Sequence, residues 1–333
     1  MSKHRKPQLP PRFPPARFRA QSPRTPPLLE LDRFSTSDIE HWNARSQDVD
    51  ELGAILYSGL EPQRKRYHDE LIAALRTASP APVEFTRWVR IVNARYNEAP
   101  LATAGSLRAI GGRFNIGAAV TNAIGPPWPA LYVASNFETA YREKFGIAKD
   151  SRVDGLTAEE LALSPGASFS AFGVNGHLST VFDLAQPDSL KAVAKVLAKF
   201  TLPKEAVKLG RRLKLPQSDL AMIRTPKALM HALLELNWRT LPIQLGNPSS
   251  SQIFGSWVME AGYEAIRYPS TKGDGDCLAV FPHRLASDDS YVELADAIAP
   301  SVRHTRLDMG SADQLCGWEV LPRSQHPPNE PRA

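Results

Sequence analysis

The chain has 333 residues, of which 42% are hydrophobic, and its formal net charge is +5 at pH 7. This length accommodates one large domain or two ordinary ones with a substantial core. No apolar run approaches the ~20 residues of a membrane span, and residues 1–30 lack the apolar centre of a secretory signal. Neither Cys277 nor Cys316 belongs to a CxxC pair, which excludes a disulfide framework, and we expect a cytoplasmic protein with reduced thiols.

The positive charge is concentrated at the N-terminus. Residues 1–29 contain seven Lys and Arg residues and no acidic residue, so the remainder carries a slightly negative net charge. The same segment is rich in proline, which disfavours both a helix and a packed core. We therefore expect residues 1–34 to form a disordered basic tail. Nucleic acid is expected to bind only through this tail, in a salt-sensitive way, or through a partner protein.

Residues 35–80 are predicted to form a helical N-terminal extension. Ser37 and Glu40 stand at capping-box spacing. A second helix is expected from about Pro62 to Thr77, before a proline-containing linker. The apolar face of the first helix is predicted to contain Ile39, Trp42, Val49, Leu52, Ile55 and Leu56.

From residue 85 onwards, short strands and helices are mixed. A strand is predicted over 85–92, a loop over 105–115, a strand over 130–134 and a helix over 136–145. Further along, the patterns predict a helix opening at Thr157, two strands over 168–184 with a turn at Gly173–Gly176, helices over 188–240 with breaks near Pro203, Pro216 and Pro226, a helix over 252–261, and strands over 265–269 and 277–281.

This order has no regular βαβ rhythm, and the chain contains neither GxGxxG nor GxxxxGKS. It therefore predicts an α+β fold with a small mixed or antiparallel sheet, rather than a doubly wound parallel sheet. We expect one domain over 81–300 with a helical insertion at about 185–245. A polar C-terminal tail is expected over 301–333.

Three side chains indicate the chemistry. A paired-glycine turn presents Arg113, a short apolar strand contains Tyr132, and the following helix carries Glu143. Arginine matches phosphate oxygens with its planar fork, tyrosine stacks on a flat ring, and a carboxylate stabilises a developing ribosyl cation. The eight histidines are scattered without HxxxH or HExxH spacing, so no metal site is expected.

Over about residues 87 to 295, this part of the chain resembles the RES domain, the toxin half of bacterial Xre–RES toxin–antitoxin systems. Several motifs occur in the order that the family shows, which makes the resemblance specific. They are Arg90 after an aromatic-led strand, Gly-Gly-Arg-Phe-Asn at 111–115, Ala-Leu-Tyr ending at Tyr132, Glu143, Ser-Gln-x-x-Gly at 251–255, the segment 262–270, and the strand 278–281.

The resemblance implies a fold similar to ADP-ribosyltransferases and an enzyme that degrades NAD, with water or phosphate as acceptor. It also implies an Xre-like antitoxin as partner. Arg90 and Arg113 would hold the pyrophosphate, and Ser251 would lie near the nicotinamide ribose. The implied catalytic residues are Glu143, Tyr132 and Arg113, and the implied NAD-binding residues are Arg90, Arg113, Asn115, Tyr132, Ser251 and Gly112.

Other functions remain open from the sequence. A protein ADP-ribosyltransferase would use the same chemistry, with the long loop at 116–128 as an acceptor surface. A catalytically silent interaction module would keep the fold as a scaffold for partners. The resemblance does not extend to residues 1–80 or to most of 185–245, so the roles of these segments are not implied by it.

Overall fold

The computed structural model describes residues 36–122, 125–147, 149, 168–216, 220–285, 288–297 and 299–317. The tail expected over 1–34 and the helix expected at Thr157 lie outside these residues. The chain divides after Gln47 into two units, of which the second, from Asp48 onwards, contains the sheet and the site described below.

The N-terminal helices differ from the expected pair in where they break. Helix α1 (Thr36–Arg66) continues through Pro62, and α2 (His68–Arg76) begins two residues after α1 ends. Proline in a helix interior removes a backbone donor and crowds the preceding turn, yet α1 continues for four residues beyond Pro62. Leu52 is buried as predicted, whereas Val49 is 51% exposed and does not belong to the apolar face.

The sheet confirms the mixed α+β prediction and adds closure, which the sequence did not predict. Among the described residues, seven strands pair in the order β1-β4-β7-β6-β5-β8-β9, and β1 also pairs with β5. The first five therefore close into a barrel, in which β5–β6 is the parallel pair. Their bounds are β1 (Ala81–Asn93), β4 (Leu131–Ala134), β5 (Phe169–Asp183), β6 (Ala265–Pro269) and β7 (Asp276–Val280), and the sheet continues to β8 (Tyr291–Leu294) and β9 (Arg306–Leu307).

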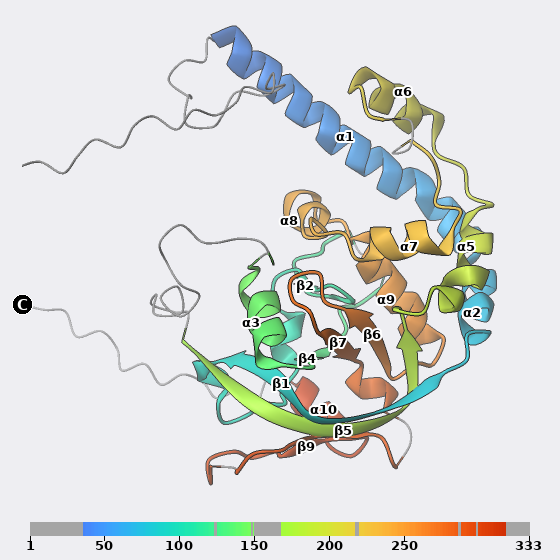
Figure 1. Cartoon of the computed structure of the whole chain (residues 1–333). Helices are drawn as coiled ribbons and strands as arrows, with labels where there is room; N and C mark the ends of the chain where they lie inside the picture. Colours follow the sequence, from blue (N-terminus) through green and yellow to red (C-terminus); the bar gives the residue numbers. More distant parts are fainter. Residues whose placement is uncertain are drawn as a thin grey trace, which may run out of the picture. The chain divides into compact units, whose positions relative to one another are not determined.

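Two strands predicted over 168–184 are in fact one. Strand β5 runs without a turn beside β1, and the two long strands lie side by side in Figure 1. Its glycines serve close packing: a Cβ on Gly173 would lie 2.7 Å from Asp296 Oδ2, and a Cβ on Gly176 would lie 2.4 Å from the Phe85 ring. Glycine in a strand can mark close approach as well as a turn, and here it marks the former.

Alternation along the strands separates two hydrophobic cores. Leu131 and Val133 pack in one core with the inward residues of β5 and β7, whereas their neighbours Ala130 and Tyr132 belong to the other. Successive side chains of a strand point to opposite faces, and the second core also contains residues of the helices. The helices that contact one another there are α2, α5 (Lys191–Leu197), α7 (Pro226–Leu233) and α9 (Ser250–Glu260).

Three smaller helices complete the described elements near the site and in the insertion. Helix α3 (Phe137–Phe145) follows β4 and is capped by the Asn136 side chain, which accepts a hydrogen bond from Thr139 N. The insertion also contains α6 (Lys204–Arg212) and α8 (Thr240–Leu245), so its predicted helices and breaks are confirmed.

The fold extends further towards the C-terminus than expected. Residues 301–317 were assigned to a polar tail, but β9 pairs with β8, and α10 (Ala312–Cys316) follows it. Leu307 and Leu315 are fully buried, and this apolar anchoring explains why the segment is ordered. Residues 318–333 lie outside the described part of the chain.

Candidate active site

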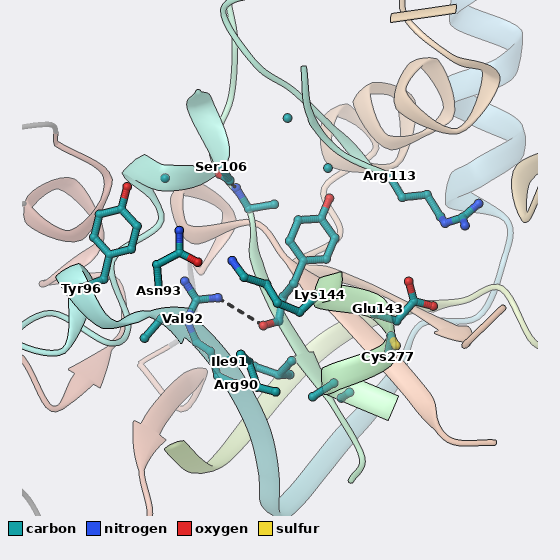
Figure 2. Close-up of a pocket in the computed structure, with 18 of the residues that line it drawn as sticks. Arg90, Ile91, Val92, Asn93, Tyr96, Ser106, Arg113, Glu143, Lys144 and Cys277 are labelled. Atoms are coloured by element: carbon teal, nitrogen blue, oxygen red, sulfur yellow. Dashed lines mark hydrogen bonds between the residues drawn. The ribbon is translucent and has the colours of Figure 1, made fainter. Parts of the chain in front are cut away.

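A cavity of about 390 Å³ lies beside β1, β4 and α3. Its walls bring together Arg90, Gly112, Arg113, Tyr132 and Glu143, which were all singled out from the sequence. In Figure 2, Arg113 and Glu143 lie on one side of the cavity, and Asn93 and Tyr96 lie on the other. Arg113, Tyr132 and Glu143 therefore lie together on one cavity, whereas Asn115 and Ser251, the other two residues singled out, do not line it.

The loop that presents Arg113 is a tight hairpin of β2 (Gly111–Gly112) and β3 (Asn115–Ile116), called here the glycine hairpin. Gly111 has a φ of 82°, which lies in the left-handed region where a side chain is strained. A Cβ on Gly112 would lie 2.4 Å from the Tyr132 hydroxyl. The paired glycines are therefore needed both for the turn and for the approach of β4.

Asn115 organises this hairpin instead of facing a ligand. It is fully buried, and its Oδ1 accepts hydrogen bonds from Gly112 N at 2.8 Å and from the Tyr132 hydroxyl at 2.9 Å. Its Nδ2 donates to the carbonyls of Ser106 and Trp128. These bonds use its two donors and both acceptor positions, so the side chain of Asn115, one of the expected NAD-binding residues, positions the hairpin with all of its hydrogen-bonding groups.

Tyr132 is held by its hydroxyl and lines the cavity with its ring. The hydroxyl donates to Asn115 and accepts a hydrogen bond of 3.0 Å from Phe114 N. Burial raises the pKa of Tyr132 above its ordinary value, so the phenol stays protonated near neutral pH. Its ring is the part that can contact a ligand.

Ser251 does not reach the cavity. Ser249, rather than Ser251, caps α9 and forms a capping box with Gln252, and the buried Ser251 hydroxyl lies 3.0 Å from that of Ser249. Within the same motif, the residue that connects to the site is Gln252. Its Nε2 lies 2.8 to 3.1 Å from the carbonyl oxygens of Ile110, Gly112 and Asn115.

Arg113 is 4% exposed and is bound mainly to neutral groups. Its Nη1 donates to the carbonyls of Leu233 and Glu235, and its Nη2 donates to Thr271 Oγ1 at 3.1 Å. Burial lowers its pKa, and the nearby Glu143 carboxylate opposes that shift. No carboxylate among the described residues forms an ion pair with it, so its charge is not neutralised locally.

Arg90 is similarly committed to backbone carbonyls. Its Nε and Nη2 donate to Pro100 and Ala102, and its Nη1 donates to Tyr132 O at 3.1 Å, the dashed line in Figure 2. Burial lowers the pKa of Arg90 to about 10. Arg87, three residues earlier in β1, lies in a β-bulge and pairs with Asp296.

Glu143 is fixed by the segment that follows β6. Ser270 Oγ donates to Glu143 Oε1 at 2.7 Å, and Thr271 N donates to the same oxygen at 3.3 Å. Its Oε2 accepts no hydrogen bond from any residue in the described part of the chain. Ser270 is the last residue of the 262–270 motif, and Thr271 follows it directly. A Ser-Thr pair after a strand does not by itself predict a contact with Glu143.

The helical insertion forms another wall of the cavity. Trp238 is 7% exposed, and both it and Arg239 line the cavity. The Trp238 ring centroid lies 5.7 Å from the Arg113 guanidinium carbon and 4.7 Å from that of Arg239. Sequence reasoning missed this pair because the family resemblance did not extend over the insertion.

The described residues lack both a metal-binding group and a membrane-spanning helix. They contain no group of three or more His, Cys, Asp or Glu side chains that could hold a metal ion. They also contain no helix with the length and apolarity required to cross a membrane.

Comparisons with known proteins agree with the resemblance seen in the sequence. The family model of the RES domain matches residues 87–303. The solved structure described as the M. tuberculosis MbcT–MbcA toxin–antitoxin complex matches with 15% sequence identity and a TM-score of 0.38, over 74% of this chain and 97% of that chain. That structural likeness is too distant to support a functional argument. No curated protein matches the chain.

Proposed function

Because this chain belongs to the RES domain family, whose model spans residues 87–303, we propose that it is an enzyme that cleaves the nicotinamide–ribose bond of NAD. The observation that carries the proposal is the meeting of Glu143, Arg113 and Tyr132 on one cavity of about 390 Å³. A pocket of this size, with a few convergent polar groups, suits a small-molecule ligand.

Glu143 is the proposed catalytic carboxylate. When the bond breaks, the electron pair stays on the nicotinamide nitrogen, and positive charge develops on the ribosyl carbon. A fixed carboxylate stabilises that charge in the transition state. Ser270 and Thr271 hold Oε1, which leaves Oε2 for a ribose hydroxyl or for the attacking molecule.

The acceptor completes the reaction by forming a new bond to the ribosyl carbon. With water, the products are ADP-ribose, nicotinamide and a proton released to solvent. With phosphate, one of its oxygens takes the place of nicotinamide. The Tyr132 ring would face the flat nicotinamide or its ribose, since its hydroxyl already bonds Asn115 and Phe114 N.

The anionic substrate agrees with the charge around the cavity. Arg113 is buried and Arg90 is half-buried, and the side-chain hydrogen bonds of both go to carbonyls and a hydroxyl rather than to carboxylates. A positive wall of this kind favours a pyrophosphate over a neutral ligand. Arg113 additionally approaches Glu143 through Thr271, which couples anion binding to the carboxylate.

We extend the proposal to the biological role of a toxin in a toxin–antitoxin pair. NAD loss would stop growth, and an Xre-like antitoxin would neutralise the enzyme most simply by covering the cavity between Arg113 and Glu143. The prediction for cells is that expression of the chain alone arrests growth, whereas expression of Glu143→Gln at equal level does not.

The decisive experiment follows NAD over time with purified protein, with and without phosphate, beside Glu143→Gln. A fall of ~10²–10⁴-fold in rate is expected for the variant. Dependence of the rate on phosphate would identify phosphate as the acceptor, and its absence would identify water. If folded wild-type protein consumes no NAD under either condition, the proposal is wrong, and transfer of label from NAD to a protein would then support the ADP-ribosyltransferase alternative.

A further inference from the structure

The insertion places the Arg239 guanidinium at the cavity, and the hydrogen-bond donors of this group are not used to hold the fold together. Arg239 is half-buried between α7 and α8, and its guanidinium stacks on the Trp238 ring at 4.7 Å. The guanidinium forms no hydrogen bond or ion pair with the residues that the structure describes. Stacking on an aromatic face holds an arginine in place while its in-plane N–H donors stay available.

Arg90 and Arg113, the two arginines expected from the sequence, already use donors of their guanidinium groups within the protein. Three N–H groups of Arg90 donate to Pro100, Ala102 and Tyr132, and Arg113 makes three bonds to Leu233, Glu235 and Thr271. A two-pronged grip on phosphate needs two adjacent free donors in one plane. Neither arginine keeps its whole fork for a ligand, although both contribute charge.

The cations around the cavity outnumber the carboxylates that could neutralise them. Burial lowers the pKa of Arg113 and of Lys272, and the positive charge of Arg239 lowers both further, which places the three cations within mutual electrostatic reach. Glu143 acts on Arg113 and Lys272 in the opposite direction. One carboxylate facing several cations leaves a surplus of positive charge that an anion can satisfy.

We propose that Trp238 and Arg239 form a phosphate-binding subsite. In it, Arg239 donates hydrogen bonds directly to a diphosphate oxygen of a nucleoside diphosphate group, while Trp238 fixes the plane of the Arg239 guanidinium. Arg113 then acts as a positioning residue that joins the insertion to Thr271. The subsite rests on the proposed function for its place in catalysis, but its anion binding is testable without any NAD cleavage.

The test measures binding of ADP and of inorganic pyrophosphate by calorimetry to the full chain. Arg239→Gln is expected to weaken both at least about tenfold, since a hydrogen bond to a charged group is lost. Arg211→Gln is the matched control, because Arg211 is exposed on α6 and forms no ion pair with a described residue; it should bind like wild type. Arg239→Lys keeps the charge but loses the fork, and it should bind about threefold or more weakly even if Arg239→Gln fails to fold.

Tryptophan fluorescence supplies a second readout. The chain has six tryptophans, and a ligand held beside Trp238 should change an emission component that Trp238→Phe removes. A change on ADP addition that persists fully in Trp238→Phe would place the ligand elsewhere and overturn the subsite.

The outcomes separate this inference from the proposed function. Equal ADP and pyrophosphate binding by Arg239→Gln and wild type, or no binding by wild type, overturns the subsite even if Glu143→Gln abolishes NAD loss. Binding that depends on Arg239 in a protein that consumes no NAD supports the subsite and rejects the proposed function.

Discussion

Ser270 and Glu143 are joined by a hydrogen bond of 2.7 Å, from the hydroxyl at the end of β6 to a carboxylate on α3. The next residue, Thr271, donates its N–H to the same carboxylate oxygen and accepts a hydrogen bond from Arg113. Two consecutive residues therefore set the geometry of both the anionic and the cationic side of the cavity.

Replacing Ser270 by Ala should lower kcat for NAD cleavage by about 10- to 100-fold, because a hydrogen bond to a charged group contributes ~1.5–3 kcal/mol. ADP affinity should change less than kcat, since Ser270 contacts the carboxylate and not the proposed phosphate subsite. Ser58→Ala, which removes a hydroxyl that bonds only Ala54 O on α1, is the control. Unchanged kcat in Ser270→Ala would show that Glu143 needs no such positioning.

Gly112→Ala should destabilise the fold by about 1–3 kcal/mol, as expected of overpacking. The new Cβ would lie within 2.6 Å of three atoms of the Tyr132 phenol, which itself is held by Asn115. Gly105→Ala is a matched control, because its Cβ would meet the Tyr96 ring at an ordinary 3.7 Å. Urea unfolding of both variants checks the difference, and equal stabilities would contradict the proposed tight fit.

Gln252→Leu should cost about 3 kcal/mol of stability and also disturb the glycine hairpin. The substitution removes the side-chain donor shared by the carbonyls of Ile110, Gly112 and Asn115. Ile110 O keeps a hydrogen bond from Gly117 N, so the cost falls on the other two carbonyls, at about 1–3 kcal/mol for a buried unsatisfied acceptor. The exposed Gln244→Leu on α8 serves as comparison. The free energies of unfolding are measured in urea, and a loss below 1 kcal/mol for Gln252→Leu would indicate that the hairpin does not depend on this amide.

Stability should fall as the pH rises from 9 to 10. Burial raises the pKa of the Cys277 and Cys316 thiols above the ordinary 9.0, so the folded state binds these protons more tightly than the unfolded chain. Their stabilisation is fully present below the unfolded pKa and is lost as pH rises through the raised folded values, at up to about 1.4 kcal/mol per pH unit for each thiol.

Urea unfolding of wild type and Cys277→Ala at pH 8, 9 and 10 measures this loss. The variant should show a smaller decrease between pH 9 and 10. The range stops at 10 because burial lowers the pKa of Arg90 to about 10, which makes its contribution to stability increase with pH above that value. Identical decreases in both proteins would refute a role for the Cys277 thiol.

Local patterns predicted most elements of the fold but not its closure. The strand at 130–134, the helix at 136–145 and the helices of the insertion follow from apolar periodicity, turn residues and caps, which are all local. Closure requires β1 to pair with both β4 and β5, and no local signal encodes a pairing between distant strands. For the same reason Gly173 and Gly176 suggested a turn, because their close neighbours Asp296 and Phe85 are far away in the sequence.

The sequence predicted those site residues that belong to a recognisable motif and also lie at the cavity. Arg113, Tyr132 and Glu143 stand on elements whose ends meet at the cavity, so residue type and position were sufficient. The resemblance implies Ser251 as an NAD-binding residue, but the helix turns its side chain into the core. Ser270 and Arg239 act through contacts across the fold, with α3 and with the cavity, and only the assembled structure reveals them.

The close contacts of the glycines in and around the hairpin divide the site into a part that tolerates few substitutions and a part that tolerates more. A Cβ on Gly111, Gly117 or Gly255 would lie within 2.5 Å of backbone atoms, so the floor beneath Arg113 cannot accept larger residues without moving the main chain. Trp238 and Arg239, by contrast, line the cavity from the insertion. Substitutions in the insertion can therefore change which ligand or inhibitor binds while Glu143, the proposed catalytic carboxylate, keeps its place, so that selectivity and chemistry would have separate evolutionary targets in one domain.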